Sequence, residues 1–139
     1  MFRFIFIAFA LLSIASCSTA LKVDPIASEY NNLSLKYYVE NHGKDRRQLE
    51  KIIASELKDK GYDVSSGYKS ERPVNADILI TYDDRWQWDM SNYLIHMRID
   101  LRDPETNVLL GTGSSYQTSL ARENEGVVIN KIISSMFGK

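Results

Sequence analysis

The feature that most constrains the fold of this chain is a nearly complete alternation of apolar and polar residues between positions 93 and 102. Successive side chains of a β-strand point to opposite faces of a sheet, so this period of two predicts a half-buried strand. The buried face would carry Tyr93, Ile95, Met97, Ile99 and Leu101, and the wet face His96, Arg98, Asp100 and Arg102. Such a strand needs other strands to pair with and an apolar layer to cover it.

Two flanking segments share this period. The even positions from 76 to 90 are mostly apolar, comprising Ala76, Ile78, Ile80, Tyr82, Trp86, Trp88 and Met90. Asp84 interrupts that series, so we expect a bend or bulge near Asp83 and Asp84. Residues 103–107 have proline at the second position of a type I turn, which predicts a hairpin into a strand with Val108, Leu110, Thr112, Ser114 and Tyr116 on one face. The three strands are predicted to form an antiparallel meander.

Two helices and two further strands complete the prediction. A strand over 33–40 precedes a helix with Asp45 as N-cap, which Gly61 ends. A weaker strand near 62–68 is expected at a sheet edge because it is short and Pro73 follows it. A stripe formed by Val128 or Ile129, Ile132, Ile133 and Met136 predicts a C-terminal helix over about 124–137.

These elements predict an α+β fold, a two-layer sandwich. The sheet would be antiparallel or mixed with four to five strands, both helices would cover one face, and the order would be β-α-β-β-β-β-α. We expect a single domain over 33–139, because that length can bury a sizeable core. Residues 17–32 show no clean period and are predicted to be a tether.

The first sixteen residues differ from the rest in composition. Arg3 precedes an apolar run from Phe4 to Leu12, which is too short to span a bilayer as a permanent helix. A positive start, an apolar core and then small residues are typical of a secretory signal peptide, here residues 1–16.

The sequence Leu12-Ser13-Ile14-Ala15-Ser16-Cys17 that follows resembles the lipobox of bacterial lipoproteins. The resemblance implies cleavage between Ser16 and Cys17, with acyl chains attached to Cys17. Two or three acyl chains hold a protein lastingly on a membrane without spanning it. Ser18, where some lipoproteins have aspartate, resembles the signal for the periplasmic face of the outer membrane. With this lipobox, the stretches 76–82 and 103–113 resemble small α+β lipoproteins of Gram-negative envelopes, which implies an envelope location and a fold but no activity.

Composition excludes several classes of protein. The formal net charge of -1 and the pI of about 6.1 provide no basic field for nucleic acid. The one cysteine excludes a disulfide scaffold and a cysteine-rich zinc site. His42 and His96 have no partner at ligand spacing, so we expect no metal and no cofactor.

No motif for catalysis stands out, and we predict no enzyme and no catalytic residue. Gly111-Thr112-Gly113-Ser114 lacks the strand-to-helix turn of a reactive serine. A carboxylate pair among Asp77, Asp83, Asp84 and Asp89 would suit a glycosidase, although the solvated face of a strand is the simpler interpretation. Trp86 and Trp88 are the candidate ligand or partner surface, and the alternative is that both indoles complete the core.

The sequence therefore predicts a membrane-anchored periplasmic lipoprotein, a non-enzymatic binding or assembly module. Its expected partners are the membrane and another envelope protein or a glycan. The alternative is a periplasmic lipoprotein that binds a glycan or another small ligand through Trp86 and Trp88, and a hydrolase ranks below both.

Overall fold

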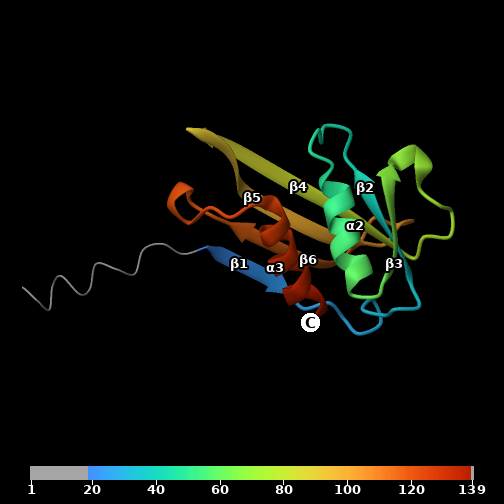
Figure 1. Cartoon of the computed structure of the whole chain (residues 1–139). Coiled ribbons are helices and arrows are strands. Elements are labelled where there is room, and N and C mark those ends of the chain that lie inside the picture. The colour runs from blue at the N-terminus through green and yellow to red at the C-terminus, as the bar shows by residue number, and fades with distance from the viewer. Residues whose placement is uncertain (1–18, 139) are drawn as a thin grey trace, which may run out of the picture.

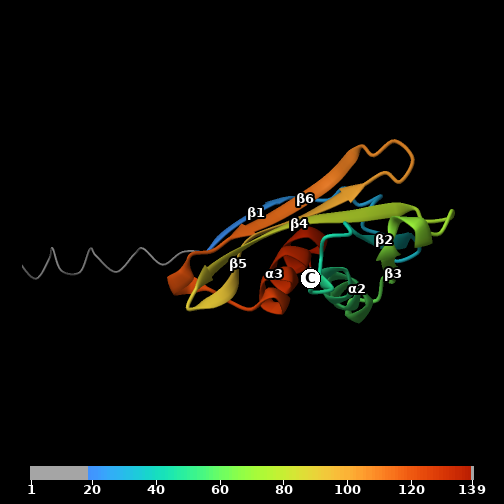
Figure 2. The same ribbon diagram turned by 90° about the horizontal axis from the view of Figure 1, so that it is seen from above.

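The structure, a computed structural model, describes residues 19–138; the predicted signal peptide and Cys17 lie outside them. The described chain forms a mixed sheet of six strands with two helices against one face (Figures 1 and 2). The predicted α+β class is confirmed. In chain order the elements are β1 (Ala20–Asp24), β2 (Lys36–Asn41), α2 (Leu49–Asp59), β3 (Asp63–Tyr68), a 3-10 turn η1 (Lys69–Glu71), β4 (Ile78–Asp89), β5 (Ser91–Arg102), β6 (Leu109–Tyr116), a second 3-10 turn η2 (Ser119–Ala121) and α3 (Glu125–Phe137).

The prediction of four to five strands and its element order are wrong, because the structure adds β1 before the first expected strand. β1 pairs antiparallel with β6, from Ala20 opposite Tyr116 to Asp24 opposite Thr112. The sheet therefore begins inside the segment expected to be a tether. Val23 and Ile26 lie partly buried against the core, and this packing fixes the strand at the sheet edge.

The strand order across the sheet is β1-β6-β5-β4-β2-β3. β2 lies parallel to both β3 and β4, with α2 as the crossover between β2 and β3. Gly61, at φ 93°, follows the end of α2, and the Tyr62 N–H donates to the Leu57 carbonyl. β3 is an edge strand, as predicted.

β4, β5 and β6 form the predicted antiparallel meander, but the irregularity lies later than expected. The β4–β5 register shifts between Arg85 and Trp86, where Ile95 is skipped. The shift changes the face of the residues beyond it, so Leu94 joins Met97 in the core instead of Ile95.

The core fills the space between the sheet and the helices. Ile53 and Leu57 of α2 meet Ile129 and Ile132 of α3 there, and all four are fully buried. In β6 the glycine positions face the helices, because a Cβ on Gly113 would lie 2.8 Å from Ile132 and Met136 side-chain atoms. Of the alternating series predicted for this strand, Val108 and Tyr116 are exposed, while Leu110 packs partly buried against the core.

Candidate functional site

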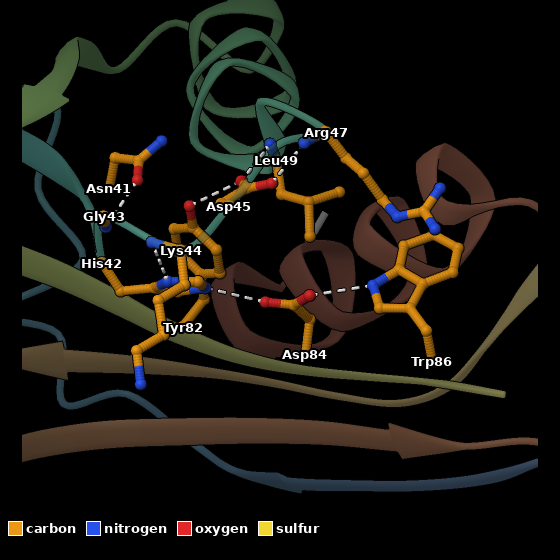
Figure 3. A network of polar contacts seen from close by, with 10 residues as sticks. All are labelled: Asn41, His42, Gly43, Lys44, Asp45, Arg47, Leu49, Tyr82, Asp84 and Trp86. Carbon is orange, nitrogen blue, oxygen red and sulfur yellow. Dashed lines mark hydrogen bonds and ion pairs between the residues drawn. The ribbon is translucent and has the colours of Figure 1, made fainter.

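A cluster of polar side chains joins the turn after β2 to the middle of β4 (Figure 3). The turn is formed by local hydrogen bonds, since Gly43 at φ 79° donates its N–H to Asn41 Oδ1 at 2.8 Å. Asn41 itself is buried. The tight turn places His42 and Asp45 within hydrogen-bond distance of side chains on β4.

His42 and Asp84 form the centre of this cluster. His42 Nε2 lies 2.9 Å from Asp84 Oδ1, while the Lys44 N–H donates to His42 Nδ1 at 3.2 Å. Because Nδ1 accepts a hydrogen bond, the proton of the neutral ring is on Nε2. The second oxygen of Asp84 accepts from Trp86 Nε1 at 2.8 Å. Asp84 thus joins the β2–α2 turn to the first of the two tryptophans.

Asp45 connects the same turn to the start of α2. Its carboxylate accepts the Arg47 and Leu49 N–H groups, each at 2.6 Å, and the Tyr82 hydroxyl at 2.7 Å. Asp45 was predicted as N-cap, and it does satisfy the N–H of the first helical residue, although Gln48 is the residue that directly precedes the helix.

Hydrogen bonding sets the protonation states of Asp45 and Tyr82. Burial acts to raise the pKa of Asp45, but the hydrogen bonds from Tyr82, Arg47 and Leu49 together outweigh it and hold that pKa below its ordinary value. Burial and the bond to Asp45 raise the pKa of the Tyr82 hydroxyl. Asp45 is therefore ionised and Tyr82 protonated at neutral pH, as the hydrogen bond between them requires.

An open cavity of about 420 Å³ lies beside the cluster, lined by His42, Lys44, Tyr82, Asp83 and Asp84. Both ring nitrogens of His42 and both carboxylate oxygens of Asp84 have hydrogen-bond partners. The pair therefore joins the β2–α2 turn to β4 beside the cavity. Across residues 19–138, no group of three or more histidine, cysteine or acidic side chains could hold a metal ion.

The acidic residues considered for a carboxylate pair lie apart. Asp77 precedes β4 and accepts the Lys36 N–H at 2.8 Å, whereas Asp89 ends that strand. Asp83 and Asp84 are consecutive strand residues and point to opposite faces of the sheet. Only Asp84 joins the cluster.

The sheet face opposite the helices carries a second polar network. Asp100, although buried, accepts Thr112 Oγ1 at 2.6 Å and Arg102 Nη2 at 2.8 Å, and lies 3.5 Å from Arg98 Nε. Two shallow cavities of about 380 and 490 Å³ lie on this face and share Arg102 in their lining. The face is therefore polar and internally paired.

The two tryptophans of the candidate surface have different surroundings. Trp86 packs partly buried against the core, and the guanidinium carbon of Arg47 lies 3.6 Å from the centre of its ring. Trp88, two residues further along β4, is 70% exposed. One indole is thus covered by Arg47 and linked to Asp84, while the other is open to solvent.

Trp88 belongs to an apolar end of the molecule that we call the hairpin tip, comprising Trp88, Met90 and Leu120. Met90 is 89% exposed at the β4–β5 turn, and Leu120 in η2 is 85% exposed. Arg122 holds η2 to the hairpin, because its Nη1 donates to the Asp89 carbonyl at 3.1 Å and its guanidinium lies 5.4 Å from the Tyr93 ring centre. The tip is therefore a defined surface built from two distant segments.

Sequence patterns did not indicate the contact between His42 and Asp84, since 42 positions separate the two residues. Met90 and Leu120 were equally hard to identify as a surface, because Met90 was in phase with the core series. A signal existed only in Trp86-Gln87-Trp88, and it did not distinguish the covered indole from the exposed one.

No helix within residues 19–138 has the length and hydrophobicity needed to cross a membrane. A scan against protein-family models finds no match, and a search of curated proteins finds none either.

Solved structures do share the fold. The chain is similar to the PelC dodecamer from Paraburkholderia phytofirmans, with a TM-score of 0.61 at 15% sequence identity, covering 86% of this chain and 98% of that one. A single-residue variant of that dodecamer matches with a TM-score of 0.57 at 16% identity, covering 84% and 96% of the two chains. At these identities the comparison shows that the fold is shared.

Proposed function

We propose that this chain is a lipid-anchored protein of the bacterial cell envelope, held by acyl chains on Cys17 at the periplasmic face of the outer membrane. There it acts as a non-enzymatic binding or assembly module. The observation that carries the anchor is the sequence Ile14-Ala15-Ser16-Cys17 directly before the folded domain. Acyl chains on Cys17 would be separated from β1 by only Ser18 and Thr19.

The shape of the sheet supports an assembly role. β1 and β3 are the two edge strands, and an edge strand offers unpaired backbone groups to another chain. Across the sheet, neighbouring strands from β1 through β6 and β5 to β4 are antiparallel, whereas β4, β2 and β3 are parallel to one another. β1 therefore runs antiparallel to β3. The β3 edge of one copy could therefore extend the β1 edge of the next as an antiparallel pair. The similar PelC chain forms a dodecamer, which supports self-assembly without indicating which surfaces pair.

The test of the anchor is the intact mass of the protein purified from membranes, compared with Cys17→Ala. We expect the mass of residues 17–139 plus acyl chains for the native chain, and loss of that species in the variant. A native mass without acyl groups contradicts the anchor.

The test of assembly is the molar mass of the acylated protein in mild detergent, corrected for bound detergent. We expect a defined oligomer, because the two sheet edges can pair. A monomer at all protein concentrations contradicts self-assembly and leaves the anchor result unaffected.

A second candidate function is the binding of a glycan or another small ligand. The observation that favours it is the exposed Trp88 ring, since indoles stack on apolar faces of sugars. Trp86 would contribute less, because Arg47 already covers its ring.

A further inference from the structure

The start of β1 and the hairpin tip lie at the same end of the molecule (Figures 1 and 2). The pairing registers show this directly, because Ala20 pairs with Tyr116, Tyr116 with His96, and His96 with Arg85. Ala20 and Arg85 are thus level across the sheet. The chain leaves β1 toward Cys17 at the same end at which β4 continues past Arg85.

The two extensions beyond this level have similar lengths. The hairpin continues for four residues of β4, from Trp86 to Asp89, which is about 13 Å of strand. Cys17 precedes Ala20 by three residues, which can span at most about 10 Å. Acyl chains on Cys17 would therefore keep the bilayer surface within reach of the hairpin tip.

The side chains at that level suit a bilayer surface. Trp88, Met90 and Leu120 are all exposed by more than two thirds, and tryptophan favours the interface between headgroups and acyl chains. The segment that carries Leu120 is held in place: the buried Gln117 side chain donates to the Leu94 carbonyl at 2.6 Å and accepts the Glu123 N–H at 2.9 Å, which holds η2 against β5. A preordered apolar surface loses little conformational freedom when it binds.

We propose that the hairpin tip, formed by Trp88, Met90 and Leu120, inserts into the interface of the bilayer that carries the acyl chains of Cys17. This inference rests on the proposed lipid anchor. Insertion adds a second, non-covalent contact beside the acyl chains and fixes the orientation of the domain. The sheet then stands away from the membrane, with the 103–108 turn at its distal end.

The experiment uses the full acylated chain reconstituted into vesicles of phosphatidylethanolamine and phosphatidylglycerol, with and without bromine atoms on the acyl chains. Bromine quenches tryptophan emission only at short range, and this chain has two tryptophans. We expect brominated lipid to quench the native emission and Trp88→Phe to lose most of this quenching. Trp86 remains in both proteins as an internal reference that is partly covered by Arg47.

Two variants that each introduce one tryptophan into the Trp88→Phe protein provide the matched comparison. Leu120→Trp places an indole in η2 at the tip and should restore the quenching. Val74→Trp places one at a fully exposed position just before β4, at the opposite end, and should not restore it. Neither substitution removes a buried side chain, so all of these proteins should fold.

Failure of the inference and failure of the anchor give different results. Protein of acylated mass, bound to vesicles, whose Trp88 and Leu120→Trp emission is unaffected by bromine, would overturn insertion while the anchor stands. If that emission were also protected from an aqueous quencher, the tip would contact another protein copy, and insertion would again be overturned. An unmodified mass would overturn the anchor and this inference with it.

Discussion

At the scale of single residues, Gly113 shows how closely α3 approaches the sheet. A Cβ at this position would lie 2.8 Å from Ile132 Cγ2 and from Met136 Cγ and Sδ. We expect Gly113→Ala to lower the free energy of unfolding by about 1–3 kcal/mol, because both neighbours would have to shift in a packed core. Urea denaturation of the two proteins measures the difference.

Gly126 in the first turn of α3 is the matched control. A Cβ there would meet only Asn124 Oδ1, at 3.4 Å. Gly126→Ala should therefore leave stability unchanged or raise it by up to about 1 kcal/mol, since alanine favours the helix. Equal losses for the two variants would show that the space around Gly113 does not decide its effect.

Asp45 makes stability depend on pH. Its folded pKa lies below the ordinary value, so its contribution is complete above the unfolded pKa of about 3.9 and is lost as pH falls through the folded pKa. We expect Asp45→Asn to flatten the fall in the free energy of unfolding on acidification from about pH 5 to pH 2. Chemical denaturation at a series of pH values, with the exposed residue change Asp63→Asn as control, tests this. A slope as steep as that of the native chain in Asp45→Asn would contradict the assignment.

At the scale of elements, β1 is an edge strand of which only Val23 packs against the core. Ile26, just after β1, packs on the core and lies beside Gly111, while Leu21 within the strand is exposed. Ile26→Ala should lower the free energy of unfolding by about 1–2 kcal/mol, which is less than for a fully buried isoleucine. Leu21→Ala should change it by no more than about 0.5 kcal/mol. The urea midpoints of the two variants give the comparison, and similar midpoints would mean that β1 is not held by core packing.

β4, β5 and both helices could be predicted because their apolar positions repeat over eight or more residues, and β6 could be predicted from the turn at residues 103–107. β1 could not, because only Val23 of its five residues packs inward. The shift at Arg85 and Trp86 was also hidden, since Tyr93, Leu94 and Ile95 are all apolar and the pairing register decides that Leu94 rather than Ile95 joins the core. For β6, glycine in the inward positions removed the hydrophobic signal altogether.

At the scale of the whole molecule, the strands of the sheet differ in how far they extend at one end. The β4–β5 hairpin extends past the other strands at the end where the chain leaves toward Cys17 (Figure 2). Local patterns could not predict which exposed apolar residues lie there, because only the pairing of β4, β5 and β6 brings Leu120 and Trp88 to the same end of the molecule. The candidate residues Trp86 and Trp88 could be found from sequence, but their different exposure depends on Arg47 from another element.

The pairing of β1 with β6 has a consequence for the order of folding. Synthesis begins at the amino terminus, yet the partner of β1 is β6, near the other end of the chain, so β1 must wait until most of the sequence has been made. The β4–β5–β6 meander closes through short loops and needs no such delay. The last strand to join the sheet is then β1. Under the proposed anchor it is also the strand beside the acylated Cys17, so folding would be completed on the membrane side only after the rest is formed.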